Sequence, residues 1–164
     1  MRIGHGYDVH LFAENRALVL GGVTIPFDKG LMGHSDADVL THAVIDALLG
    51  AAGLGDIGKL FPDTDDAYKD ISSLTLLDKV IKLMEEKGFT IGNIDCTVVM
   101  LKPKLSPYIE EISKNLAGHC HITRDRVNVK ATTEEGAGLG EEAAGAHAVC
   151  LLNYTEGFFA GAFF

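Results

Sequence analysis

The stretch from His34 to Gly50 constrains the fold most, because it has the pattern of a polar loop that runs directly into an amphipathic helix. Ser35 and Asp38 have the three-residue spacing of a capping box, so we expect Ser35 to cap this helix. Apolar residues then recur every three or four positions and predict one buried face. His42 lies beside that face, with Asp46 one turn further on, where a carboxylate can orient the imidazole. A histidine here also suits a core residue bonded to the backbone, so the helix alone leaves both interpretations open.

Composition indicates one globular domain, which we expect to span residues 1–164. The 14 basic and 23 acidic residues give a net charge of −9, which argues against a nucleic-acid-binding surface. A phosphate ligand remains compatible with this charge, because metal ions and backbone N–H groups supply a local positive field. Cys96, Cys120 and Cys150 are widely spaced, as expected of free thiols in a reducing compartment.

The two ends of the chain carry different signals. The N-terminus lacks the apolar region of a secretion signal, and no run approaches the ~18 apolar residues that span a bilayer. The stretch from Phe158 to Phe164 is unusually apolar for a tail. We therefore expect it to pack within an oligomer or to make the protein poorly behaved.

Hydrophobic periodicity and turn residues predict the order of the remaining elements. We expect strands at 2–10, 94–101, 127–132 and 146–153, a hairpin at 18–25 around Gly21 and Gly22, and helices at about 73–87 and 107–118. Ser106 and Pro107 have the pattern of a cap and a first helical residue. This order predicts an α+β fold, a two-layer α/β sandwich in which helices cover one face of a single sheet.

Asp8, His10 and His42 form a candidate metal set. Asp8 and His10 are two residues apart, so on a strand their side chains project from the same face. Two imidazoles and one carboxylate are typical of a catalytic zinc site, which keeps a coordination position open for water or substrate. A strand with the His42 helix packed on it can bring the three together. A solvated strand end is the simpler alternative for the first two residues.

A second candidate site follows the predicted strand at 127–132. Hydroxyls and carboxylates at 132–135 precede Gly136, Gly138 and Gly140. Hydroxyls there can hold phosphate oxygens, and a carboxylate can carry Mg²⁺ or Mn²⁺. A plain strand end that runs into a glycine loop is the simpler interpretation of these residues alone. The segment is not a P-loop, because no Gly-Lys-Ser/Thr follows the glycines.

Several long motifs together resemble the 2-C-methyl-D-erythritol 2,4-cyclodiphosphate synthase family of the non-mevalonate isoprenoid pathway. These motifs lie at 2–10, 33–36, 38–42, 55–65 and 127–133, and the resemblance runs from residue 1 to about 135. It implies a homotrimer with active sites at subunit interfaces. It also implies cyclisation of 4-diphosphocytidyl-2-C-methyl-D-erythritol 2-phosphate to the cyclodiphosphate, with release of CMP. The substrate's own 2-phosphate attacks, which agrees with the lack of a nucleophile-elbow serine or a Cys/His signature in this chain.

The resemblance assigns roles to individual residues. It implies Zn²⁺ at Asp8, His10 and His42, Mg²⁺ or Mn²⁺ at Glu135, and transition-state stabilisation by His34 and Thr133. Contacts with the erythritol phosphate arm are implied for Ser35, Asp56, Ile57, Gly58, Phe61, Pro62, Asp63, Thr64 and Asp65. Contacts with the cytidine are implied for Met100, Pro103, Lys104, Leu105, Ser106, Ala131, Thr132 and Thr133. Asp8, His10, His34 and Glu135 are also expected to contact substrate.

The chain departs from the family after Glu135. The family continues with an aromatic residue and a Thr-Gly-Arg-Gly-Glu-Gly stretch, which contributes to substrate contacts and to the central channel of the trimer. Here Leu139 stands in the aromatic position, no arginine follows, and the segment is about two residues shorter. The resemblance therefore does not extend to isoprenoid-diphosphate binding along that axis. Glu134 stands in place of a third threonine, and the tail from Tyr154 has no counterpart.

Two other functions remain open from the sequence. A zinc phosphohydrolase would use bound water in place of the internal phosphate and release a linear phosphate. A non-catalytic binder of cytidine nucleotides and metal would release no CMP at all. The family resemblance predicts a location in the bacterial cytoplasm or, for a mature plastid form, in the stroma.

Overall fold

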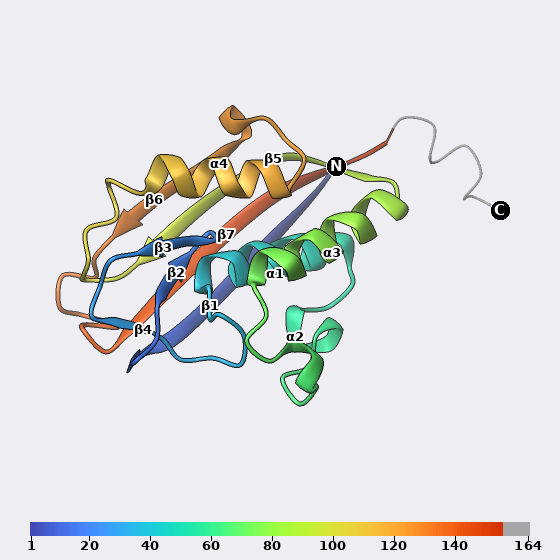
Figure 1. The fold of residues 1–164 in the computed structure, drawn as a ribbon. Coiled ribbons are helices and arrows are strands. Elements are labelled where there is room, and N and C mark those ends of the chain that lie inside the picture. Colours follow the sequence, from blue (N-terminus) through green and yellow to red (C-terminus); the bar gives the residue numbers. More distant parts are fainter. Residues whose placement is uncertain (156–164) are drawn as a thin grey trace.

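The computed structural model describes residues 1–155 and confirms a mixed α/β fold in two layers, with the helices on one face of the main sheet (Figure 1). The elements are β1 (Arg2–Glu14), β2 (Leu18–Leu20), β3 (Val23–Ile25), β4 (Lys29–Leu31), α1 (Val39–Ala52), α2 (Ile57–Leu60), α3 (Ser73–Glu86), β5 (Phe89–Val99), α4 (Ile109–His119), β6 (Val127–Thr132) and β7 (Ala143–Tyr154). Short 3₁₀ turns lie at Asp66–Tyr68 and Arg124–Arg126. The apolar stretch at 158–164 lies outside the described residues.

The main sheet has five strands in the order β4-β1-β7-β5-β6. β1 pairs antiparallel with β7, which pairs antiparallel with β5, whereas β5 and β6 are parallel. The parallel pair is joined through α4, as a crossover requires. β2 and β3 form the predicted hairpin, with Gly21 and Gly22 both at positive φ.

Several predicted boundaries were wrong. α4 begins at Ile109 and not at Pro107, because residues 106–108 form a turn, and its N-cap is Tyr108, which makes no side-chain capping bond, and not Ser106. The helix also continues past Gly118 to His119. β5 and β7 begin earlier than predicted, at Phe89 and Ala143. The segment at 53–66, where no helix or strand was predicted, contains the short helix α2.

Two glycines set the distance between α1 and the sheet. A Cβ atom on Gly6 would lie 1.9 Å from the carbonyl oxygen of Ala43, and one on Gly4 would lie 1.9 Å from that of Ala47. The helix therefore lies directly on the backbone of β1, as the two glycines in the predicted strand indicated. This close contact brings His42 on α1 beside the next inward-facing residues of β1, which are Asp8 and His10.

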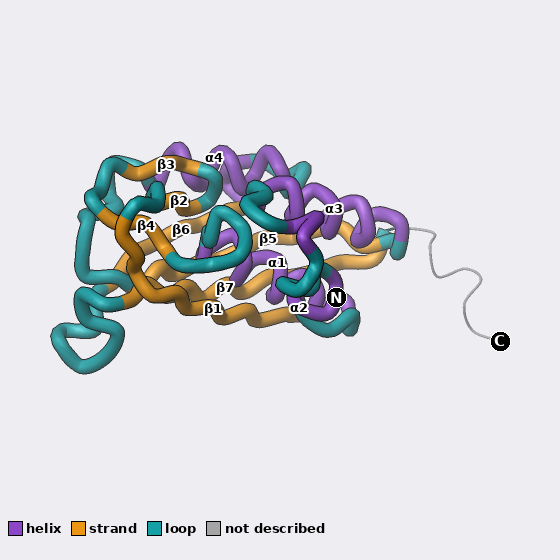
Figure 2. Tube along the Cα trace, turned by 60° about the horizontal axis from the view of Figure 1, so that its bottom comes forward, coloured by secondary structure: helices purple, strands orange, loops and turns teal. Residues whose placement is uncertain are grey.

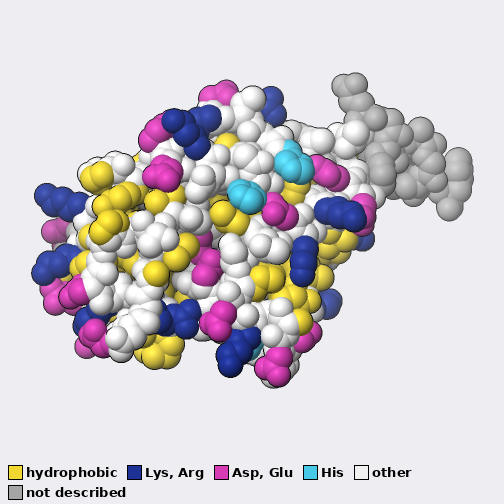
Figure 3. Space-filling model, viewed as in Figure 1, with side chains coloured by type: hydrophobic (Ala, Val, Ile, Leu, Met, Phe, Trp, Pro, Cys, Tyr) yellow, Lys and Arg dark blue, Asp and Glu magenta, His cyan; other side chains and the backbone are white. Residues whose placement is uncertain are grey.

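α1 is buried around most of its circumference, not on one face as predicted. The main sheet covers one side, and α3 and the hairpin contact others (Figure 2). Its side chains join a single core with those of α3, α4 and the inner face of the sheet. On the helix-covered side, acidic and basic side chains are interspersed over the visible surface of the described residues (Figure 3).

The opposite face of the sheet is covered by no helix within residues 1–155 (Figure 2). Apolar side chains from β1 and β7 point outward there, with exposed fractions of 74% for Ile3, 57% for Leu11 and 42% for Val149. Tyr7 and Val9 on β1 belong to the same surface, which we call the open face. Within the described part of the chain, no helix has the length and apolar character needed to cross a membrane.

Candidate metal centre and active site

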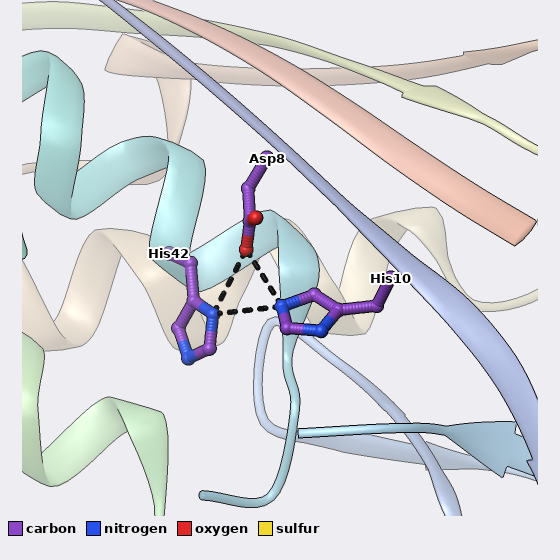
Figure 4. Close-up of side chains that lie close together, drawn as sticks. All are labelled: Asp8, His10 and His42. Carbon is purple, nitrogen blue, oxygen red and sulfur yellow. Dashed lines mark hydrogen bonds and ion pairs between the residues drawn. The ribbon is translucent and has the colours of Figure 1, made fainter. Parts of the chain in front are cut away.

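Asp8, His10 and His42 converge on one point between β1 and α1 (Figure 4). Asp8 Oδ2 lies 2.8 Å from His10 Nε2 and 2.9 Å from His42 Nδ1, and the two nitrogens are 3.3 Å apart. His42 is buried and the other two are half-buried. The predicted trio is thus assembled by one strand and one helix, which can approach this closely because Gly4 and Gly6 lie between them.

The outer nitrogens of both rings have hydrogen-bond acceptors. His10 Nδ1 lies 2.5 Å from the carbonyl oxygen of Met32, to which it can only donate. His42 Nε2 lies 2.8 Å from Ser73 Oγ. With protons on these outer nitrogens, both rings present unprotonated nitrogens to the Asp8 carboxylate. Three acceptor atoms in van der Waals contact repel one another, so the arrangement calls for a cation among them.

The spacing of the three atoms fits a tetrahedral transition-metal ion. Bonds of about 2.0–2.1 Å at tetrahedral angles place ligand atoms about 3.3 Å apart, which matches the separation of the two nitrogens, whereas Asp8 Oδ2 lies closer to each of them, at 2.8 and 2.9 Å. Without a metal, hydrogen bonds join the Asp8 carboxylate to the two imidazoles. Burial raises the pKa of Asp8, but hydrogen bonds with His10 and His42 outweigh it and leave the pKa well below its usual range. Burial lowers the pKa of His10, but its hydrogen bond to Asp8 raises the pKa above the ordinary value overall.

Two sequence predictions about the surroundings of His42 were wrong. Asp38, not Ser35, caps α1, because its carboxylate accepts the Thr41 N–H at 3.0 Å. Asp46 does not orient His42, since its carboxylate accepts the Ile57 N–H at 2.7 Å. Ser73 Oγ, not Asp46, is the hydrogen-bond partner of His42 Nε2. From the sequence, Ser73 was predicted only to begin a helix.

A pocket of about 400 Å³ opens beside the trio. Its lining includes predicted residues from the loops around α2 and before α1, together with Gly33, Tyr68 and Leu76, which the sequence did not single out. The predicted residues in its wall are Asp8, His10, His34, Ser35, His42, Ile57, Gly58, Phe61 and Asp63. Asp56 caps α2, and Asp65 caps the 3₁₀ turn that follows. Pro62 and Thr64 are exposed in the same loop.

The predicted cytidine residues form a second pocket, of about 250 Å³. It lies where the ends of β5 and β6 meet the loop after β5. The lining consists of Met100, Leu101, Pro103, Lys104, Leu105, Ser106, Ala131, Thr132 and Thr133. Every residue predicted for this role is therefore brought to one place, and Leu101 is the addition.

Thr133 and Glu135 lie beside the second pocket, not beside the metal-binding trio. Thr133 Oγ1 donates to Glu135 Oε1 at 2.5 Å, and the Glu134 carboxylate accepts the Leu139 N–H. The two pockets share no lining residue. β7 and β5 separate β1 from β6, which at ordinary strand spacing amounts to about 14 Å. Within one chain, Glu135 is thus remote from the other proposed metal ligands.

Fold and site together define a small α/β protein with an Asp–His–His group of the kind found in catalytic metal sites. The YgbB family model matches residues 1–153, so the chain belongs to the YgbB family. A 2-C-methyl-D-erythritol 2,4-cyclodiphosphate synthase from Clostridium acetobutylicum is 59% identical over 93% of this chain and 99% of its own length. A synthase of the same name from Enterococcus faecalis is 58% identical over 93% and 98%.

Solved structures agree with this assignment. A 2C-methyl-D-erythritol-2,4-cyclodiphosphate synthase in a CDP-bound form matches with a TM-score of 0.86 and 38% identity over 93% of this chain and all of its own. The bifunctional IspDF protein from Campylobacter jejuni matches with a TM-score of 0.90 and 44% identity. That match covers 93% of this chain but 42% of the larger protein.

Proposed function

We propose that the protein catalyses the cyclisation of 4-diphosphocytidyl-2-C-methyl-D-erythritol 2-phosphate to 2-C-methyl-D-erythritol 2,4-cyclodiphosphate, with release of CMP. The observation that carries this proposal is the convergent Asp8–His10–His42 group in a pocket, in a chain closely similar to synthases of that name. The reaction belongs to isoprenoid precursor biosynthesis. We assign it to residues 1–164 as one catalytic domain and, because the relatives named above are bacterial, to the bacterial cytoplasm.

The chain contributes positioning and charge, not a nucleophile. An oxygen of the substrate's 2-phosphate bonds to the β-phosphorus, the bond from that phosphorus to the bridging oxygen breaks, and CMP leaves with that oxygen. Zn²⁺ at Asp8, His10 and His42 would supply a Lewis acid, and Mg²⁺ or Mn²⁺ at Glu135 would neutralise diphosphate charge. His34 lines the first pocket and Thr133 the second, where an imidazole and a hydroxyl can donate to phosphoryl oxygens.

The second pocket has the character expected of a nucleotide-base site. Its lining includes the apolar side chains of Leu105 and Met100, and Ser106 and Thr133 contribute hydroxyl groups. A CDP-bound structure of a similar synthase supports a cytidine nucleotide as the ligand. A CDP complex of the IspF protein from Plasmodium falciparum, 34% identical with a TM-score of 0.81, supports the same assignment.

The separation of the pockets supports a homotrimer with shared active sites. One substrate has to reach both pockets, yet β7 and β5 lie between them in a single chain. A head-to-tail contact places the second pocket of one subunit against the first pocket of the next, and three such contacts close a ring. The open face gives the subunits an apolar surface to bury, which includes Ile3, Val9 and Leu11.

The test is CMP release from the substrate by the purified protein, with and without Mg²⁺ and a zinc chelator. We expect metal-dependent release with a cyclic diphosphate as co-product, and a loss of at least about 100-fold in His42→Ala. His119→Ala is the matched control, because that imidazole bonds to Asp78 on the far side of α3. A linear phosphate product would indicate a hydrolase, and binding of CDP without turnover would indicate a non-catalytic binder. The divergent segment at 136–147 is the feature that favours the binder.

A further inference from the structure

A chain of hydrogen bonds, buried between His42 and Ser73 and part-buried between Ser73 and Asp36, runs from His42 away from the Asp8–His10–His42 trio. His42 Nε2 is 2.8 Å from Ser73 Oγ, and Ser73 Oγ is 2.5 Å from Asp36 Oδ1. We propose that Ser73, backed by Asp36, is a positioning residue that fixes the tautomer and orientation of His42 for metal binding. This inference rests on the metal site proposed above, and neither residue belongs to the ligand or substrate sets assigned so far.

The chemistry of the three groups fixes the direction of the chain. An ionised carboxylate only accepts, so the Ser73 hydroxyl donates its one proton to Asp36. The lone pairs of Ser73 Oγ are then left to accept from His42 Nε2, which has to carry the ring proton. His42 Nδ1 is therefore unprotonated, and it is the nitrogen that faces Asp8 and His10. The chain thus selects the tautomer that a metal ion needs.

Ser73 is held in place by the way α3 begins. It is the first residue of the helix and is fully buried, and the N-cap Ser72 makes no side-chain capping bond. Asp36 Oδ2 accepts the Ser73 N–H at 3.0 Å in place of such a cap. The Asp36 N–H in turn donates to Ile71 O at 3.0 Å. The loop before α1 is thereby tied to the start of α3, with the hydroxyl aimed at His42.

The other candidates for this role are worse placed. Ser35 Oγ is 3.2 Å from His42 Nε2, a longer contact, and it also accepts the Ala37 N–H. Asp46 is bonded to the backbone at Ile57. A histidine ligand backed by a carboxylate through its outer nitrogen is a recurring arrangement in metal proteins, and loss of the backing group weakens metal binding by about 10- to 100-fold. Here a serine hydroxyl lies between the ring and the carboxylate.

The test compares zinc affinity in Ser73→Ala and Ser113→Ala, measured by competition with a chromophoric chelator. Ser73→Ala removes the hydroxyl but keeps the backbone N–H bond to Asp36, so the start of α3 remains tied. Ser113 is an equally buried serine whose hydroxyl donates to Ile109 O inside α4, far from the trio. We expect about 10- to 100-fold weaker zinc binding for Ser73→Ala and wild-type affinity for Ser113→Ala. The Co²⁺-loaded Ser73→Ala protein should also show a shifted visible spectrum, because the ring is no longer held in one orientation.

A double substitution separates positioning from a general loss of structure. Asp36→Asn alone should weaken zinc binding, but in the Ser73→Ala background it should cause no further loss, because the hydroxyl link is already broken and the asparagine oxygen can still accept the backbone N–H of residue 73. Equal zinc affinity in Ser73→Ala and wild type, or equal losses in Ser73→Ala and Ser113→Ala, would overturn the proposal, as would full additivity with Asp36→Asn. A wild-type protein that binds zinc tightly but releases no CMP would refute the proposed function and leave this test intact.

Discussion

The two pockets of this molecule are built in opposite ways. The metal-binding trio is held by a long strand and a buried helix, and each ring has a hydrogen bond on its outer side. The segment with Thr133 and Glu135 lies in a largely exposed loop after β6, where the Thr133 hydroxyl donates to the Glu135 carboxylate. Glu135 is also held at a positive φ of 50°, which a non-glycine residue adopts at a cost.

This difference separates the part of the site whose geometry is fixed by packed elements within one chain from the part that lies in an exposed loop. Ligands on packed elements keep their geometry before any metal or substrate arrives, whereas loop residues take their final positions when a partner or ligand covers them. The departure from the family also falls in the loop half, after Glu135, where the fold constrains the sequence least. The following predictions test this division, beginning with the packed half.

Gly6→Ala should have the largest effect, because the added methyl group would lie 1.9 Å from the Ala43 carbonyl oxygen. α1 then has to move away from β1, which takes His42 away from Asp8 and His10. We expect a loss of roughly 3 kcal/mol or more in the free energy of unfolding, and loss of zinc binding. Urea denaturation and zinc titration measure the two effects.

The control for that change is Gly118→Ala. Gly118 lies inside α4, and an added Cβ would meet no heavy atom within 4 Å. Alanine there should leave stability unchanged or raise it by up to about 1 kcal/mol. If both alanine variants behave alike, the close contact between α1 and β1 is not what positions His42.

Asp38→Ala should rank second. The buried carboxylate accepts from the Thr41 N–H, the Thr41 hydroxyl and the Gly22 N–H at 2.8–3.0 Å, so its removal leaves buried donors without partners. We expect a loss of about 2–4 kcal/mol in the free energy of unfolding, measured by thermal or urea denaturation. Asp65→Ala removes the cap of an exposed 3₁₀ turn and should cost no more than about 1 kcal/mol. Equal losses in the two variants would show that burial of the α1 cap adds nothing to the free energy of unfolding.

The same division explains how much of the molecule could be predicted from its sequence. The strand period placed Asp8 and His10 on one side, and Gly4 and Gly6 marked the strand that the helix approaches. The Asp8–His10–His42 trio could therefore be predicted once the first strand and the His42 helix were expected to pack together.

Contacts across loops could not be predicted in this way. Asp46 has the sequence spacing to reach His42, but its carboxylate accepts a hydrogen bond from the Ile57 N–H instead. Ser73 reaches His42 because Asp36 ties two distant segments together, and no local pattern encodes that pairing. Capping at Asp38 in place of Ser35 has the same origin, because Ser35 Oγ is engaged near His42 and Ser73.

In the loop half, Glu135→Gln should reduce turnover without weakening the packed half. Glutamine keeps the size of the side chain and can still accept from Thr133, but it loses the charge proposed to hold Mg²⁺ or Mn²⁺. We expect CMP release to fall by about 100-fold, with zinc affinity and melting temperature unchanged. Glu134→Gln is the matched control, since its carboxylate is engaged with the Leu139 N–H, and it should keep most of the activity. Loss of zinc from Glu135→Gln would contradict the division between the two halves.

Lys102→Ala should have the smallest effect and tests how the loop half is held together. Lys102 Nζ lies 3.0 Å from Glu141 Oε1, and this ion pair joins the loop after β5 to the loop before β7. Both side chains are about two-thirds exposed, so solvent and salt screen the pair. We expect a change below about 0.5 kcal/mol in the free energy of unfolding, as for Lys82→Ala, which removes an exposed ion pair on α3. Amide exchange at 134–142 should nevertheless become faster in Lys102→Ala and not in Lys82→Ala, because a largely exposed loop depends more on such surface links. A stability loss as large as that of Asp38→Ala would show that this loop is packed into the fold as firmly as the metal-binding trio.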